Sequence, residues 1–142
     1  MLQKSVNDAE ITPKLLFANF TITKDSLQEY STVNLSKIQF TDGSIKKTNL
    51  QENGEPLYQN QLRCVFEDDK ENEIYSTIIE HPLYKKFEYT KDDGNFGVKE
   101  VTLYKGEFFI RTDYDIKMKY IRIFEKLSTS EEKEIEKFEL KK

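Results

Sequence analysis

Cys64 and His81 are the side chains of this sequence that could act as a nucleophile and a base, and each is the only residue of its type. Nucleophilic catalysis needs the base within hydrogen-bonding reach of the nucleophile. Cys64 lies in an alternating segment in which it shares a face with Leu62 and Phe66, so we expect a buried and inert thiol. We interpret His81, which precedes a proline, as a strand-end residue that bonds backbone groups, and we predict no catalytic residue.

Metal and cofactor sites have equally little support in the sequence. Zinc sites use several Cys or His ligands, and this chain has one of each. The acidic segments 67–73 and 92–95 offer oxygen ligands for calcium, but they fit hairpin turns better than the spacing of an EF-hand loop. The five glycines form no phosphate-binding pattern, and with 26 acidic residues no glycosidase-like pair stands out. We therefore predict no metal and no cofactor.

Aromatic side chains supply much of the apolar surface. Hydrophobic residues make up 37% of the chain and aromatic residues 13%, while 34% of the residues are charged. Because each large ring buries roughly 150–250 Å², we expect a packed core rather than a disordered chain. The net charge of −4 does not indicate a basic surface of the kind that binds a phosphate backbone. We interpret the aromatic and basic residues that interleave in 104–122 as strand faces, and we predict no nucleic-acid partner.

Alternation with a period of two residues is the main structural pattern. Within residues 15–24, one face carries Leu16, Ala18, Phe20 and Ile22, which is typical of a half-buried antiparallel strand. Seven further segments have strand character and are separated by turn residues: 32–41, 57–67, 73–80, 83–90, 96–105, 107–114 and 116–126.

Two features favour a two-layer packing of these strands. The parity of the apolar positions changes between Leu35 and Ile38, which predicts a bulge near Ser36 or a strand that changes sheets. The segment 116–126 is apolar on both sides, as expected for a strand in a central position. We predict an all-β fold, a two-layer antiparallel β-sandwich of about eight strands with an immunoglobulin-like architecture. The alternative is a small lipocalin-like β-barrel.

The ends of the chain differ in composition from the middle. We predict a flexible N-terminal segment over 1–12, the β-sandwich domain over 13–127 and a charged tail over 128–142. The tail begins with Ser and Thr residues followed by acids, which favours a short helix, although the alternation in 137–140 would also suit an edge strand.

The sequence shows no recognisable set of catalytic residues, which favours a non-catalytic binding or structural module. We expect its partner to be a protein or another surface ligand. Three aromatic residues lie off the main parity of their strands and are the candidate partner surface: Phe17, Tyr84 and Tyr104. Two alternatives are a small β-barrel that binds an apolar ligand, and an acidic protein that neutralises a basic partner through residues 61–100.

The predicted cellular location depends on how the polar first residues of the sequence are interpreted. No apolar run approaches the length that spans a bilayer, so we predict no membrane span. The polar first residues suit a cytoplasmic protein or a periplasmic or secreted chain whose signal peptide was removed, and we favour the extracytoplasmic location. The sequence does not indicate an oligomeric state.

Overall fold

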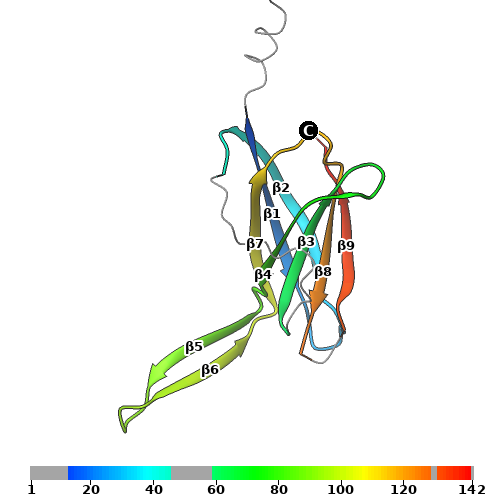
Figure 1. Ribbon diagram of the computed structural model, residues 1–142. Coiled ribbons are helices and arrows are strands. Elements are labelled where there is room, and N and C mark those ends of the chain that lie inside the picture. The colour runs from blue at the N-terminus through cyan, green and yellow to red at the C-terminus, as the bar shows by residue number, and fades with distance from the viewer. Residues whose placement is uncertain (1–12, 46–58, 129–130, 142) are drawn as a thin grey trace, which may run out of the picture.

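The computed structural model describes residues 13–45, 59–128 and 131–141. These residues form nine β-strands in three antiparallel sheets, without a helix, so the predicted all-β fold is confirmed (Figure 1). The strands are β1 (Lys14–Thr23), β2 (Thr32–Asp42), β3 (Gln61–Glu67), β4 (Glu73–Glu80), β5 (Tyr84–Thr90), β6 (Phe96–Thr102), β7 (Lys105–Asp113), β8 (Tyr120–Lys126) and β9 (Lys133–Glu139). The predicted N-terminal segment 1–12 lies outside the described residues.

Seven of these strands build a two-layer sandwich. One layer has the strand order β2-β1-β7 and the other the order β4-β3-β8-β9. No strand pairing joins the two layers within the described residues, so the barrel alternative is not supported. The core between the layers is built from alternate strand residues of both sheets and from two residues of the connections, Leu83 and Met118. The strand residues are Leu16, Ala18, Phe20, Ile22, Val33, Leu62, Cys64, Phe66, Ile110, Ile121 and Ile123.

Phe20 lies at the centre of this core and touches both layers. Its ring stacks on Phe108 of β7 at 4.8 Å between centroids and 16° between planes. It also contacts the ring of Phe138 on β9, in the opposite sheet, at 5.8 Å. The even positions of β1 therefore face inward, as their alternation predicts.

The bulge predicted near Ser36 is confirmed. Asn19 of β1 pairs with Lys37 of β2, but the next residue, Phe20, pairs with Leu35. Ser36 is the extra residue, and its hydroxyl donates a hydrogen bond to the carbonyl oxygen of Asn19 at 2.9 Å. The bulge changes the parity of β2, which keeps apolar residues facing the core on both sides of it.

The helix predicted for the C-terminal tail is wrong, because the described tail forms β9. This strand pairs with β8, where Phe138 lies opposite Ile121, and it forms one edge of the four-stranded sheet. Ile135, Phe138 and Leu140 are partly buried against the core. Burial of these side chains and the backbone ladder to β8 together outweigh the helix-start signal of the Ser and Thr residues. The same pairing places β8 between β3 and β9, so its predicted central position is confirmed.

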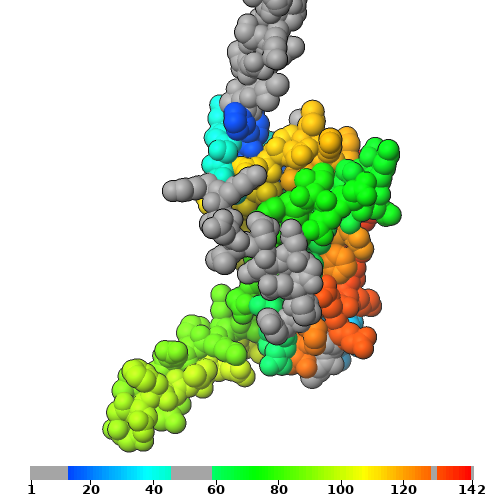
Figure 2. Space-filling view, viewed as in Figure 1, coloured from blue at the N-terminus to red at the C-terminus, as the bar shows by residue number. Residues whose placement is uncertain are grey.

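The strands β5 and β6 leave the sandwich as a separate hairpin. They pair only with each other among the described residues, from Tyr84 opposite Thr102 to Thr90 opposite Phe96. The hairpin projects from one end of the sandwich in Figures 1 and 2. Its tip is the turn predicted at 91–95, where Gly94 has a φ of 88° and its amide donates to the carbonyl of Lys91 at 2.9 Å. The expectation that these strands belong to the sandwich is therefore wrong.

Candidate functional site

A buried polar cluster lies where the hairpin leaves the sandwich. The side chains of His81 and Glu125 are fully buried, with His81 Nε2 and Glu125 Oε2 2.6 Å apart. The backbone amide of Ser31 donates to the other carboxylate oxygen of Glu125 at 2.8 Å. Glu125 comes from β8, while His81 lies in the short connection between β4 and β5, so the cluster lies where the four-stranded sheet leads into the hairpin.

This cluster does not have the geometry of a catalytic triad. The amide of Leu83 donates to His81 Nδ1 at 3.2 Å, so the lone pair of the imidazole lies on Nδ1 and the proton on Nε2. The hydroxyl of Ser31 lies 3.5 Å from that same Nε2, which already donates to Glu125. A base for Ser31 would need a free lone pair facing the hydroxyl. The hydrogen bonds therefore assign the cluster a structural role.

The environment of Glu125 keeps its carboxylate ionised inside the protein. Burial raises the pKa of Glu125, but hydrogen bonds from His81 and Ser31 outweigh burial and hold this pKa below its ordinary value. A buried carboxylate needs such partners, because an unpaired charge in the core is strongly unfavourable. The hydrogen bonds to Glu125 are therefore needed to keep its charge in the core.

The two residues that the sequence suggested for chemistry are both buried. Cys64 is fully buried, as predicted, and burial raises the pKa of its thiol to about 12. His81 bonds a backbone group, as predicted, but its carboxylate partner was missed. The sequence does hold a signal for this partner: Glu125 alternates with Ile121 and Ile123, so it lies on the same inward face of its strand as these core residues.

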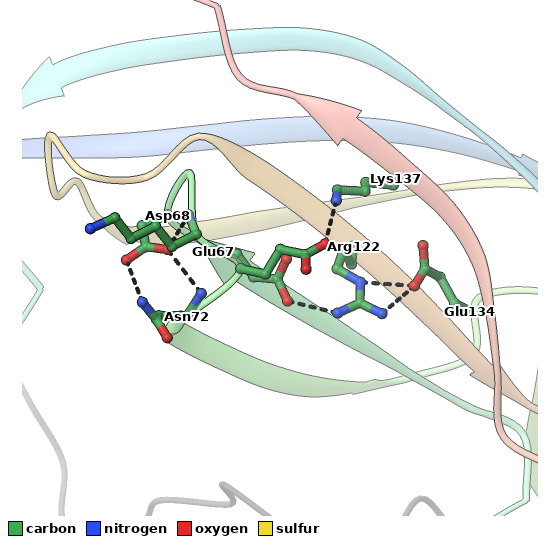
Figure 3. A network of polar contacts seen from close by, with 8 residues as sticks. Glu67, Asp68, Asn72, Arg122, Glu134 and Lys137 are labelled. Atoms are coloured by element: carbon green, nitrogen blue, oxygen red, sulfur yellow. Dashed lines mark hydrogen bonds and ion pairs between the residues drawn. The ribbon is translucent and has the colours of Figure 1, made fainter.

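A second polar network lies on the four-stranded sheet (Figure 3). Arg122 of β8 donates from Nη1 to Glu67 of β3 at 2.7 Å and from Nε to Glu134 of β9 at 2.8 Å. Hydrogen bonds to Glu134 and Glu67 raise the pKa of Arg122, and its guanidinium lies 4.9 Å from the ring centroid of Phe124. Because Glu67 is almost fully buried, its carboxylate depends on Arg122 for charge compensation.

Arg122→Ala is expected to lower the free energy of unfolding by about 2 kcal/mol, because it leaves the buried Glu67 carboxylate without its positively charged partner. The loss is moderate because the side chain of Arg122 is partly exposed to solvent. Urea denaturation measures this change. Lys137→Ala is the matched control, since Lys137 pairs with the exposed Glu71 at 3.5 Å. Equal effects of the two substitutions would contradict the role assigned to Arg122.

The hairpin carries the largest group of exposed apolar side chains on a single element. Phe87 is 54% exposed, Tyr89 50%, Phe96 75% and Val98 60%. A two-stranded hairpin has no core of its own, so these side chains gain little burial in this structure. Exposed apolar surface gathered on one element is characteristic of contact with another molecule.

The hairpin nevertheless has features that order it locally. The ring of Tyr89 lies over Gly97, directly across the ladder, and a Cβ atom at Gly97 would come within 2.5 Å of Tyr89 Cζ. Glycine at this position lets the ring lie flat against the ribbon. At the root, the amide of Leu103 donates to the carbonyl of Leu83 at 2.7 Å. The exposed aromatic side chains of the hairpin therefore lie on a locally ordered ribbon.

The structure separates the three residues of the predicted partner surface. Phe17 is half-buried on the outer face of β1, opposite Arg111 of β7. Tyr84 lies at the hairpin root, where its half-buried ring meets the edge of His81 at 4.9 Å. Tyr104 is 77% exposed in the connection between β6 and β7, on the other side of the root. Tyr84 and Tyr104 therefore lie near the hairpin, whereas Phe17 is on a different face of the sandwich.

A cleft lies between the hairpin root and the sandwich. Its volume is about 570 Å³, and its lining includes Asn60, His81, Tyr84, Lys86 and Glu100. The lining mixes basic and acidic side chains, and Lys86 pairs with Glu100 at 3.8 Å. Residues of both hairpin strands therefore line this cleft together with residues of the sandwich.

Comparisons with known proteins return no match to a family model, to a curated protein or to a solved structure. Across the described ranges there is no group of three His, Cys, Asp or Glu side chains positioned to hold a metal ion. That part of the chain also has no helix that is long and apolar enough to cross a membrane.

Proposed function

We propose that this protein is a non-catalytic binding module in which the sandwich carries the β5–β6 hairpin as a contact element for a protein partner. The observation that supports the proposal most strongly is the exposure of Phe87, Tyr89 and Phe96 on a hairpin that projects from the body. Protein interfaces are enriched in aromatic residues. A projecting ribbon can also reach a groove or edge of a partner that a flat sheet cannot.

The energetics of folding support the same proposal. The sandwich core is formed without the strand residues that the hairpin exposes, so these aromatic side chains are not needed to bury the core. Exposing them to water has a cost in solubility, which contact with a partner would remove. We also propose an immunoglobulin-like architecture for the sandwich, supported by its two packed antiparallel sheets.

The acidic alternative remains a prediction and is less favoured. The acidic side chains of residues 61–100 lie on several elements: β3, β4 and the turn between them, both strands of the hairpin and its tip. An acidic surface for a basic partner would be favoured by a single cluster, and this distribution does not provide one.

The double substitution Phe87→Ser and Phe96→Ser is expected to abolish capture of the partner. The reason is that these two rings provide apolar area on both faces of the ribbon without contributing to the core. The measurement is affinity capture from a lysate of the source organism by the immobilised chain, with quantitative mass spectrometry of the retained proteins.

Phe109→Ser is the matched control, since Phe109 is 62% exposed on β7 of the sandwich and away from the hairpin ladder. The free energy of unfolding of the hairpin variant should stay within about 0.5 kcal/mol of the wild type. An unchanged set of retained proteins for the hairpin variant, or an equal loss in the control, would refute the proposal.

A further inference from the structure

The two faces of the hairpin differ in chemistry. Residues directly opposite each other in an antiparallel ladder point to the same face, and successive residues alternate between the faces. The register therefore places two lysines and two aromatic rings together on one face, which we call the lysine–aromatic face: Lys85, Phe87, Tyr89 and Lys99.

The charges of the hairpin strands are sorted between these faces. Both acidic residues of the strands, Glu88 and Glu100, fall on the opposite face, where Lys86 pairs with Glu100 at 3.8 Å. Within the described parts of the chain, Lys85 and Lys99 form no ion pair. The lysine–aromatic face therefore presents two uncompensated positive charges on a chain whose net charge is −4.

We propose that the lysine–aromatic face binds an acidic segment of a protein partner that also carries apolar side chains. This inference rests on the proposed function and adds the chemistry of the partner. Two lysine ammonium groups beside two exposed rings complement a segment in which carboxylates alternate with apolar groups. A nucleic acid would offer a similar combination of anions and apolar faces, but its extended phosphate backbone would carry negative charge beyond the two lysines toward the acidic body, whereas a short acidic segment need not.

The test uses the full chain and short fluorescein-labelled peptides of defined composition. One peptide contains Glu, Ser and Leu, and two counterparts carry Gln or Lys at every Glu position. A single-stranded oligothymidine of matched length is the nucleic-acid probe. Binding is followed by fluorescence anisotropy at low and high salt. The Glu peptide is expected to bind about tenfold more tightly than the Gln peptide at low salt and to lose this advantage at high salt.

Matched substitutions locate the binding face. Lys85→Gln with Lys99→Gln is expected to remove the preference for the Glu peptide, whereas Lys86→Gln, which removes a charge from the opposite face, should preserve it. The proposal is overturned if the Glu and Gln peptides bind equally, if no peptide binds, if Lys86→Gln has the same effect, or if the oligothymidine binds more tightly than the Glu peptide.

The outcomes separate this inference from the proposed function. If the Glu and Gln peptides bind equally and Phe87→Ser abolishes both, the hairpin is a contact element without a preference for acidic partners. In that case the partner chemistry is wrong and the proposed function stands. If Phe87→Ser with Phe96→Ser leaves capture from the lysate unchanged, the proposed function fails as well.

Discussion

His81→Ala is expected to lower the free energy of unfolding by about 3 kcal/mol, because it leaves a buried carboxylate without the hydrogen bond that the neutral imidazole donates to it. In the wild type, Nε2 of His81 donates to the fully buried Glu125 carboxylate at 2.6 Å. The alanine variant removes that donor and also the acceptor of the Leu83 amide, so both a charge and a backbone donor lose their partners. Chemical denaturation followed by circular dichroism measures the loss.

The control for this prediction removes the carboxylate charge as well. Glu125→Gln in the His81→Ala background should recover part of the lost stability, because the unpaired charge is then absent from the core. If the double variant is less stable than His81→Ala alone, or if His81→Ala costs less than about 1 kcal/mol, the hydrogen bond from His81 does not stabilise the buried carboxylate as described.

Phe20→Ala is expected to cost about 3–5 kcal/mol, as is typical for truncating a buried Phe. The effect should be large here because the ring contacts Phe108 in its own layer and Phe138 in the opposite layer. The truncation leaves a cavity between the sheets that rigid strands cannot collapse to fill. Thermal and urea unfolding curves both report this loss.

Phe109→Ala is the matched control, since Phe109 lies on the same sheet but is 62% exposed. Its cost should stay below about 0.5 kcal/mol. Comparable losses for the two variants would contradict the assignment of Phe20 to the centre of the core.

Strand positions could be predicted from the sequence because alternation reports which face of a strand is buried. The segment around Phe20 shows the inward face of β1, and the parity change near Ser36 correctly predicts the bulge. The burial of Cys64 follows from the same alternation, since its neighbours on that face are apolar. These features depend only on residues that are near each other in the chain.

The remaining features depend on long-range pairing, which a local pattern cannot show. Phe87 and Tyr89 alternate as core residues do, yet their strands pair only with each other among the described residues, and both rings are exposed. The tail becomes β9 because β8 offers it a free edge, not because its own sequence excludes a helix. The pair formed by His81 and Glu125 joins residues 44 positions apart, so only the fold brings them together.

Photo-crosslinking from the hairpin tests most directly whether the hairpin is the contact element. The variant Phe87→benzoylphenylalanine places the photoreactive group on the exposed ribbon, and Gln39→benzoylphenylalanine places it on an exposed position of β2 as the matched control. After irradiation in a lysate of the source organism, the hairpin variant is expected to form a discrete covalent adduct with a partner protein that the control does not form. Adducts from position 39 but not from position 87 would contradict the assignment of the hairpin as the contact surface.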